Sequence, residues 1–300
     1  MSAGLVLIDK PRGWTSHDAV ARTRKLANTR RVGHAGTLDP LATGLLVLGI
    51  GQATKLLTFI VGADKTYETT IRLGATTISD DSESDFVKYA NPEKIAQITA
   101  AQIDLEISKL RGKIAQVPSA VSAIKVDGKR AYAMVRAGEQ VELKAREVVI
   151  SRFDRVSEPR LVEHADHKFI DFDAVIDCSS GTYVRALARD LGELLGSGAH
   201  LIALRRTRIG QYRIDSAQTL DSAEPLKILP LAEAAAAIFP TVSLTAEAQR
   251  DILYGKRISA PSDCPDLVAG ITESQKLLAI LEKKGSELKS VVVFPEDQND

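Results

Sequence analysis

The sequence predicts an α+β fold built on a mixed, largely antiparallel sheet. Segments typical of strands and of helices both occur along the 300 residues, but without the regular βαβ alternation of a doubly wound protein. The apolar fraction of 44% provides enough side chains for a sizeable core. After Pro240 the sequence changes to short strand-like runs separated by polar turns, and the length suggests about two domains. Both observations predict a separate small unit at the C-terminal end.

The N-terminal segments predict a strand, a helix and a glycine-rich loop. Residues 4–8 form a short apolar run that Asp9 ends, which is typical of a strand. Ser16 is a plausible N-cap, because Asp18 and apolar residues at helical spacing follow it. Three further elements are expected next: a loop at residues 33–44, a buried strand at 45–48 and a short helix at 52–60.

The middle of the chain predicts two strands and an amphipathic helix. Residues 67–73 alternate between apolar and polar side chains, as a half-buried strand does, and residues 172–178 are a second candidate. Residues 184–195 follow a Ser-Ser-Gly turn and predict a helix. At roughly 100° per residue, Arg185 lies about 200° from Leu187 on this helix, so we expect it to point away from the core.

The C-terminal part predicts a small all-β domain. Strand-like runs alternate with polar turns at residues 267–271, 277–281 and 291–294. We therefore expect one domain at residues 1–238 and a second at residues 239–300.

Composition argues against several classes of protein. No run approaches the roughly 18 apolar residues of a membrane span, and we identify no signal peptide. The cysteines, Cys178 and Cys264, lie far apart and show no metal-like spacing. A reduced, cytoplasmic protein fits this composition best.

Charge is segregated along the chain although it sums to zero. The 39 basic residues balance 39 acidic ones, but the basic side chains gather in residues 10–31, 125–146 and 185–213. Solvated helix faces would explain any one of these clusters. Three clusters together, with an acidic one at residues 80–85, suit a polyanionic partner.

The loop at residues 33–44 is the best candidate for chemistry. Pro40 disfavours a helical conformation for Asp39, so this carboxylate is expected on an extended loop that also carries His34. An Asx turn, in which Asp39 bonds its own backbone, is the structural alternative. Arg185 is a candidate cation for keeping Asp39 ionised; contact with phosphate or solvent is the alternative for that arginine.

Two tyrosines and a pair of histidines each allow both a functional and a structural interpretation. Tyr67 lies on the apolar face of a predicted strand, where a core tyrosine is the alternative to a functional one. Tyr183 lies in a turn leading into a helix N-terminus, which suits an anion or a stacked base. His164 and His167 could bind a metal, but their polar surroundings favour a solvated loop.

The loop at residues 33–44 resembles the catalytic loop of the TruB family of tRNA pseudouridine synthases. Matching motifs follow in order over residues 4–215: GLVLIDKP at 4–11, KTYE at 65–68, RLG at 72–74, QVPS at 116–119, SAIK at 122–125, GTYVR at 181–185, GAH at 198–200 and LRR at 204–206. The resemblance implies a pseudouridine synthase catalytic domain at residues 1–238. Residues 239–300 resemble a reduced PUA-type RNA-binding domain, although the negative charge of the last 40 residues disfavours strong RNA binding there.

The resemblance implies that the chain isomerises uridine 55 in the T loop of tRNA to pseudouridine. The base would leave the stack first, because its glycosidic bond is otherwise shielded. Asp39 would be the catalytic aspartate. It would either attack C1′, as a glycosidase carboxylate does, or remove a sugar proton to give a glycal.

The remaining roles also come from the resemblance. Tyr67 would stack on the base and assist proton removal at C5, and Arg185 would pair with Asp39. The expected substrate-binding residues besides Tyr67 are His34, Tyr183, Leu204 and Lys10. No cofactor or metal is expected. The expected partner is the T-arm stem-loop of tRNA, with no membrane, no obligatory protein partner and a monomeric state.

Two other classes of function compete with a stand-alone enzyme. One is an RNA-binding or tRNA-folding module that uses the cleft only to open the T arm. The other is a guide-dependent relative inside a ribonucleoprotein, which the lack of an extended basic tail disfavours. The set of Asp39, Tyr67 and Arg185 favours the enzyme.

Overall fold

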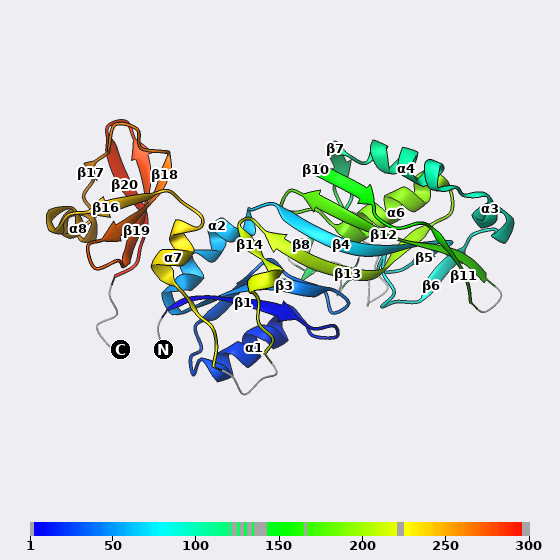
Figure 1. The fold of residues 1–300 in the computed structure, drawn as a ribbon, viewed down its shortest axis with the longest axis horizontal. Helices are drawn as coiled ribbons and strands as arrows, with labels where there is room; N and C mark the ends of the chain where they lie inside the picture. The colour runs from blue at the N-terminus through cyan, green and yellow to red at the C-terminus, as the bar shows by residue number, and fades with distance from the viewer. Residues whose placement is uncertain are drawn as a thin grey trace.

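The computed structural model describes residues 3–119, 121, 125–126, 129–130, 134, 143–164, 167–220 and 225–295. Most of these residues surround one large sheet (Figure 1). Its strands are β1 Gly4–Lys10, β2 Val32–Ala35, β3 Thr43–Ile50, β4 Lys65–Leu73, β7 Gly112–Gln116, β10 Arg146–Arg155, β11 Arg160–His164, β12 His167–Cys178, β13 Ala199–Ile209, β14 Tyr212–Arg213 and β15 Leu229–Pro230.

The strand order of this sheet is β15-β1-β3-β13-β4-β12-β10-β7. Three more strands pair outside this path: β2 with β3, β14 with β13 and β11 with β12. Among the described strand pairings of this sheet, only the one between β3 and β13 is parallel. The predicted α+β fold with a mixed, largely antiparallel sheet is therefore confirmed. Because β13 pairs with both β3 and β4, segments from three parts of the chain meet at the centre of the sheet.

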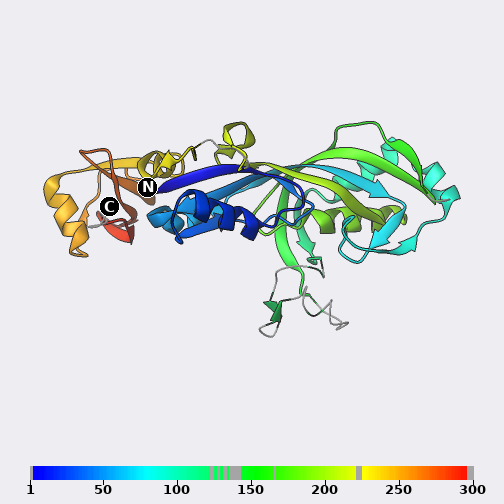
Figure 2. The same cartoon turned by 90° about the horizontal axis from the view of Figure 1, so that it is seen from below.

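Helices pack against this sheet or extend from it. The described helices are α1 Ser16–Leu26, α2 Leu57–Val61, α3 Pro92–Gln97, α4 Ala100–Lys109, α6 Val184–Leu195, α7 Leu231–Ala236 and α8 Ala246–Leu253, with 3-10 turns at Gly51–Lys55 and Ile214–Ser216. Figure 2 shows α1 and α6 on the same side of the sheet. Leu187 and Leu191 of α6 are fully buried in the main core, and α6 has the predicted bounds.

The start of α1 differs from its prediction. Thr15, not Ser16, is the N-cap: its hydroxyl accepts a hydrogen bond from the backbone N–H of Asp18, and the Asp18 carboxylate accepts one from the N–H of Thr15. Ser16 instead donates to Leu38 O at 3.1 Å and accepts from Leu38 N at 2.8 Å. This pair of bonds fastens the first turn of α1 to the glycine-rich loop.

The predicted loop and short helix are each divided further. The first residues of the loop form β2 and its last two begin β3, which leaves residues 36–42 as the loop itself. The helix expected at residues 52–60 is a 3-10 turn followed by α2. His164 and His167, expected in a solvated loop, instead end β11 and begin β12, and the His167 ring stacks on Tyr89 at a centroid distance of 3.6 Å.

A second sheet follows Pro240. Its strands are β16 Thr241–Leu244, β17 Ile258–Ser259, β18 Leu267–Thr272, β19 Leu277–Lys284 and β20 Glu287–Val293, in the order β16-β18-β19-β20-β17. The structure adds helix α8, which the prediction of an all-β unit did not include. Thr245 caps it by accepting from Ala248 N at 3.2 Å, and Ile252 is buried.

The two sheets share one hydrophobic cluster. Leu5 and Leu45 of the large sheet belong to it together with Ile271 and Ile280 of the second sheet. Lys55 also donates from Nζ to Val293 O at 2.7 Å. Removing residues 239–300 would therefore expose core side chains of the large sheet. The division into domains at residues 238 and 239 stays a prediction.

Smaller elements complete the described chain. Two hairpins, β5 Ala75–Thr77 with β6 Phe86–Tyr89 and β8 Lys125–Val126 with β9 Lys129–Arg130, pair apart from both sheets. Within the described residues, no helix has the length and apolar character needed to cross a membrane.

Candidate active site

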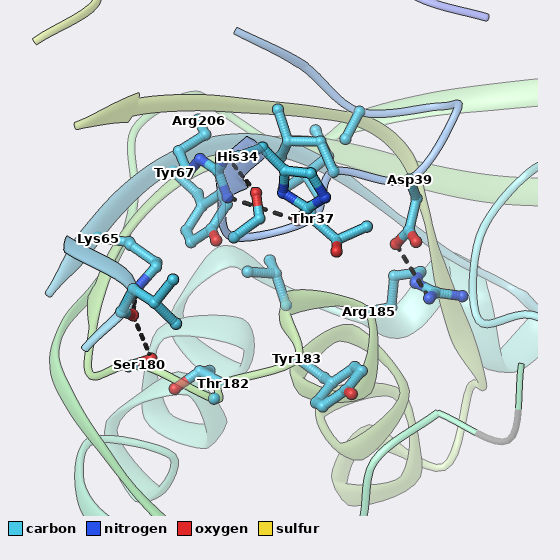
Figure 3. Close-up of a pocket in the computed structure, with 17 residues that line it drawn as sticks. His34, Thr37, Asp39, Lys65, Tyr67, Ser180, Thr182, Tyr183, Arg185 and Arg206 are labelled. Carbon is cyan, nitrogen blue, oxygen red and sulfur yellow. Dashed lines mark hydrogen bonds and ion pairs between the residues drawn. The ribbon is translucent and has the colours of Figure 1, made fainter. Parts of the chain in front are cut away.

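A pocket of about 470 Å³ lies where the loop at residues 36–42, β4, β13 and the start of α6 meet (Figure 3). A cavity of this size is suitable for a small ligand. Six of the seven predicted site residues line it: His34, Asp39, Tyr67, Tyr183, Arg185 and Leu204. The fold thus brings together residues that are far apart in the sequence.

Asp39 lies on a loop whose backbone is fixed at several points. Ser16 holds Leu38 from one side, and the N–H of Gly13 donates to Pro40 O at 2.8 Å from the other. The Asp39 side chain is 41% exposed, and its Oδ2 lies 3.0 Å from Arg185 Nη2. This ion pair favours the interpretation of Asp39 as a functional carboxylate over the Asx turn.

Arg185 points into the pocket and is nevertheless buried. Its exposure is 5%, because a turn at residues 79–81 covers it. Nη1 donates to Ser79 O at 2.7 Å, and Nη2 donates to Val121 O at 3.0 Å. The helical phase correctly placed Arg185 away from Leu187, but the sequence did not reveal that other segments would enclose it.

Asp81 is a site residue that sequence reasoning missed. Its Oδ2 lies 3.4 Å from Arg185 Nη1, and its side chain is only 2% exposed. The next carboxylate, Asp80, accepts a hydrogen bond from Ser119 at 2.6 Å and lies 3.3 Å from Arg189. The acidic cluster at residues 80–85 was the available signal, but nothing in the local pattern placed it beside Arg185. Arg185 therefore has one buried and one exposed carboxylate partner.

Tyr67 forms part of the pocket wall on β4. Its neighbours across the sheet are Ile176 on β12 and Arg206 on β13. Burial raises the pKa of the Tyr67 hydroxyl, and the positive charge of the nearby Arg206 opposes that shift. The hydroxyl is consequently neutral near pH 7, and the ring presents an apolar surface to the pocket.

His34 reaches the pocket from β2. Its ring lies edge-on to His17 at a centroid distance of 5.9 Å. Burial, followed by the nearby His17, lowers the pKa of His34. Its imidazole is therefore neutral near pH 7, and it is suited to stacking or hydrogen bonding rather than to binding phosphate as a cation.

Tyr183 and Leu204 complete the predicted lining. Tyr183 precedes α6, and Gln116 holds its peptide: the N–H of Tyr183 donates to Gln116 Oε1 at 2.8 Å, and Gln116 Nε2 donates to Tyr183 O at 3.1 Å. Leu204 on β13 is 8% exposed. These residues make the pocket partly aromatic and apolar around its charged pair.

Lys10 is the one predicted site residue that does not line the pocket. Its side chain is fully buried, and Nζ donates to Pro11 O at 3.0 Å and to Trp14 O at 2.6 Å. Burial lowers the pKa of Lys10 to about 8. In this structure Lys10 fixes the turn between β1 and α1, which lies next to the loop that carries Asp39.

Arg206 and Lys65 line the pocket but were not predicted as site residues. Arg206 is 1% exposed and Lys65 is 6% exposed. Arg206 lies in the LRR motif and Lys65 in the KTYE motif, so the sequence did mark both positions. The motifs did not show that these side chains would turn inward.

The basic clusters lie partly within the described residues. Ser122, Ala123 and Ile124 of the SAIK motif, and much of the cluster at residues 125–146, lie outside the described residues. In the cluster at residues 10–31, Arg24, Lys25 and Arg30 are exposed. Across the part of the chain that the structure describes, no group of three His, Cys, Asp or Glu side chains could hold a metal ion.

Comparison with known proteins gives a consistent result. The model for the N-terminal domain of TruB family pseudouridylate synthases matches residues 24–184, and the model for the C-terminal domain of tRNA pseudouridylate synthase B matches residues 185–229. The tRNA pseudouridine synthase B of Leifsonia xyli is 51% identical over 99% of this chain and 98% of its own length. That of Thermobifida fusca is 50% identical over 98% of this chain and 99% of its own length.

A solved structure of an H/ACA RNP bound to a substrate RNA containing 2′-deoxyuridine shares the fold. The match has a TM-score of 0.67 at 23% identity and covers 98% of this chain and 86% of that one. A Cbf5-Nop10-Gar1 complex matches equally well, with a TM-score of 0.67 over 97% of this chain and 85% of that one. Full-length similarity, the family models and the shared fold lead to one conclusion: this chain belongs to the TruB family of pseudouridylate synthases.

Proposed function

We propose that this chain converts uridine 55 in the T loop of tRNA into pseudouridine. The observation that carries the proposal is the Asp39–Arg185 ion pair, 3.0 Å long, at a pocket also lined by Tyr67 and Leu204. The names of the relatives support tRNA as the substrate. The specific nucleotide comes from the motif resemblance.

The target base would enter the pocket only after it leaves the T-loop stack. Stacking shields the glycosidic bond, and an enzyme that acts there commonly extrudes the nucleotide. The Tyr67 ring and Leu204 offer apolar surface to a flipped uracil, and His34 could fill the space that the base vacates. Tyr183 would contact the nucleotide at the start of α6.

Asp39 would act at the ribose. Its carboxylate is accessible, and the Arg185 guanidinium lies 3.0 Å from it and orients it. An ionised carboxylate can attack C1′ to give a glycosyl ester, or it can remove the C2′ proton to give a glycal. In both routes the N1–C1′ bond breaks, N1 keeps the bonding pair and uracil rotates. In the first route C5 then bonds to C1′ and displaces the Asp39 carboxylate from it; in the second, C5 bonds to C1′ of the glycal and the Asp39 carboxyl returns the proton to C2′. C5 finally loses its proton, and N1 gains one.

The reaction rearranges bonds within one nucleotide, so we propose no cofactor or metal. Tyr67 would stack on the uracil and assist proton removal at C5. Lys10 would act through the turn that it fixes rather than by contacting substrate. Exposed basic residues of the 10–31 and 185–213 clusters would contact phosphates of the T arm.

An RNA-binding or tRNA-folding module remains the competing function. A buried arginine that holds two carboxylates favours the enzyme, because opening a T arm requires neither an ionised nor an oriented carboxylate. We further propose that the chain acts as a monomer without an obligatory protein partner. The solved ribonucleoprotein neighbours are less than 25% identical to it and share the fold.

The test is to incubate the purified protein with unmodified tRNA and with an isolated T-arm hairpin. Chemical mapping and mass spectrometry should place one pseudouridine at position 55 in both RNAs. Binding and T-arm opening without any pseudouridine would support the folding module instead. Activity only after a protein partner or a guide RNA is added would contradict the stand-alone enzyme.

A further inference from the structure

Two buried cations, Arg206 and Lys65, line the pocket. Arg206 donates from Nε to Leu45 O at 2.8 Å and from Nη2 to Gly36 O at 3.0 Å. Lys65 donates from Nζ to Val61 O at 2.9 Å and to Ala63 O at 2.6 Å. Within the described residues, neither side chain forms an ion pair. In the described part of the chain, both side chains donate their hydrogen bonds to backbone carbonyls, and the charge of Arg206 also acts on the Tyr67 hydroxyl.

These two cations converge at one end of the pocket. Gly36 has a φ of +87°, and a Cβ placed there would lie 3.4 Å from Arg206 Nη1 and 3.8 Å from Lys65 Cε. Figure 3 shows Arg206, Tyr67 and Lys65 on one side of the pocket, with Asp39 and Arg185 on the other. The negative carboxylate and the unpaired positive charges therefore lie on opposite sides of the space that a nucleoside would occupy.

Burying a cation without a counter-charge is unfavourable, and carbonyl dipoles offset only part of that cost. Burial lowers the pKa of Lys65 to about 8, and the neighbouring Arg206 contributes to the shift. Arg206 and Lys65 are at most 6% exposed, whereas a backbone phosphate remains at the protein surface. A negative charge that pairs with these two cations must therefore lie on the part of the ligand inside the pocket.

We propose that Arg206 and Lys65 stabilise the negative charge that develops on uracil as it detaches from the ribose. This proposal rests on the proposed function. When the N1–C1′ bond breaks, N1 keeps the bonding pair and uracil becomes an anion with charge spread over its carbonyl oxygens. The charge disappears once C5 bonds to C1′, C5 releases its proton and N1 gains one. Preorganised cations in a dry site lower the barrier for such a step.

Arg185 cannot perform this task from its observed position. Its two terminal nitrogens already contact Asp39 and Asp81. Its charge is thereby balanced at the ribose side of the pocket. Arg185 would thus orient the Asp39 carboxylate, whereas Arg206 and Lys65 would stabilise the negative charge on the departing base.

The experiment compares two substrates that differ in the acidity of the leaving base. Full-length wild-type protein, Arg206→Gln and Lys65→Met are assayed in single turnover on tRNA carrying uridine or 5-fluorouridine at the target position. Fluorine withdraws electrons, so the 5-fluorouracil anion needs less stabilisation from the protein. Nuclease digestion and mass spectrometry measure loss of the original N-nucleoside, which reports detachment even where C5 carries no hydrogen.

For uridine, Arg206→Gln should slow detachment by roughly a hundredfold to a thousandfold, as loss of one preorganised donor does. The factor should be clearly smaller for 5-fluorouridine, and Arg206→Lys should recover part of the uridine rate. Lys65→Met should show the same selective loss, and it provides the test if Arg206→Gln does not fold. Arg72→Gln is the matched control: this arginine pairs with Asp171 on the same sheet, away from the pocket, and the variant should show neither loss.

Equal losses for the two substrates would overturn the proposal, because a purely structural role affects both alike. Weaker tRNA binding with an unchanged detachment rate would also overturn it and make these residues phosphate contacts. A wild-type protein that leaves uridine unchanged would overturn the proposed function and this inference with it. An active wild type with equal losses in the variants overturns this inference alone.

Discussion

Replacing Arg185 with lysine should lower kcat by about a hundredfold while KM for tRNA stays nearly constant. The guanidinium holds two carboxylates with two nitrogens: Nη2 lies 3.0 Å from Asp39, and Nη1 lies 3.4 Å from Asp81. A lysine ammonium keeps the charge but is a single centre on a flexible stem, so it cannot reproduce this planar fork. One of the two carboxylates must lose its partner.

The exposures of the two carboxylates decide which one is lost. The Asp81 side chain is 2% exposed, whereas that of Asp39 is 41% exposed. Leaving a buried charge unpaired costs about 3–5 kcal/mol, whereas an exposed pair contributes about 1 kcal/mol or less because water replaces it. The ammonium should therefore stay with Asp81 and release Asp39. A displacement of about 1 Å at a reacting group costs roughly a hundredfold in rate, which sets the predicted loss.

The assay measures tritium released from tRNA labelled at uracil C5, because isomerisation removes that hydrogen. Thermal unfolding of the same variant should show a decrease of only a few degrees, since Asp81 keeps a cation. Arg72→Lys, at the bidentate pair with Asp171 away from the pocket, is the matched control and should leave kcat unchanged. A normal kcat with a raised KM for Arg185→Lys would refute this reasoning and make Arg185 a phosphate contact.

Two further predictions concern pH and salt. Burial lowers the pKa of Lys10 and of Lys65 from 10.5 to about 8. Above about pH 8 these two lysines therefore hold more protons in the unfolded chain than in the folded protein. Their contribution to the free energy of unfolding consequently rises with pH, up to about pH 10.5. Urea denaturation at about pH 7 and about pH 9 should show a smaller rise in Lys65→Met than in wild type, and an equal rise would contradict the assignment. For a T-arm hairpin, log affinity should fall linearly with log salt, by roughly 0.7–0.9 per phosphate contact. Replacing Arg24, Lys25 and Arg30 with glutamine should reduce that slope, whereas an unchanged slope would place the phosphate contacts elsewhere.

Local pattern was sufficient for much of the fold. The apolar spacing of residues 184–195 predicted α6 with its observed bounds, and the alternation at residues 67–73 lies within β4. Patterns of this kind depend on a face that the chain must bury, so they can be recognised one segment at a time. The predicted cap of α1 was one residue late, because Thr15 and Ser16 are both good capping residues. In the structure, Ser16 instead forms hydrogen bonds with Leu38 in a loop that is distant in the sequence.

The site was predictable where a motif or a backbone constraint marked it. Asp39 stood out because Pro40 follows it within a glycine-rich loop, and Tyr67 and Arg185 were candidates to which the resemblance then assigned roles. Asp81 and Arg206 could not be predicted in their roles, because these depend on contacts across the fold. Arg206 meets the Gly36 carbonyl 170 positions away, and Arg185 meets that of Ser79 across 106 positions. Only the folded chain shows which charges are paired and which are not.

The most direct test of the central claim is pseudouridine formation by Asp39→Asn on unmodified tRNA. The substitution keeps the shape of the side chain and removes its charge, and the side chain is 41% exposed, so folding and tRNA binding should persist. Mapping of position 55 after prolonged incubation should detect pseudouridine with wild type and none with Asp39→Asn. Activity of the variant within about tenfold of wild type, a loss of less than about 1.4 kcal/mol in transition-state stabilisation, would contradict the assignment of Asp39 as the catalytic carboxylate.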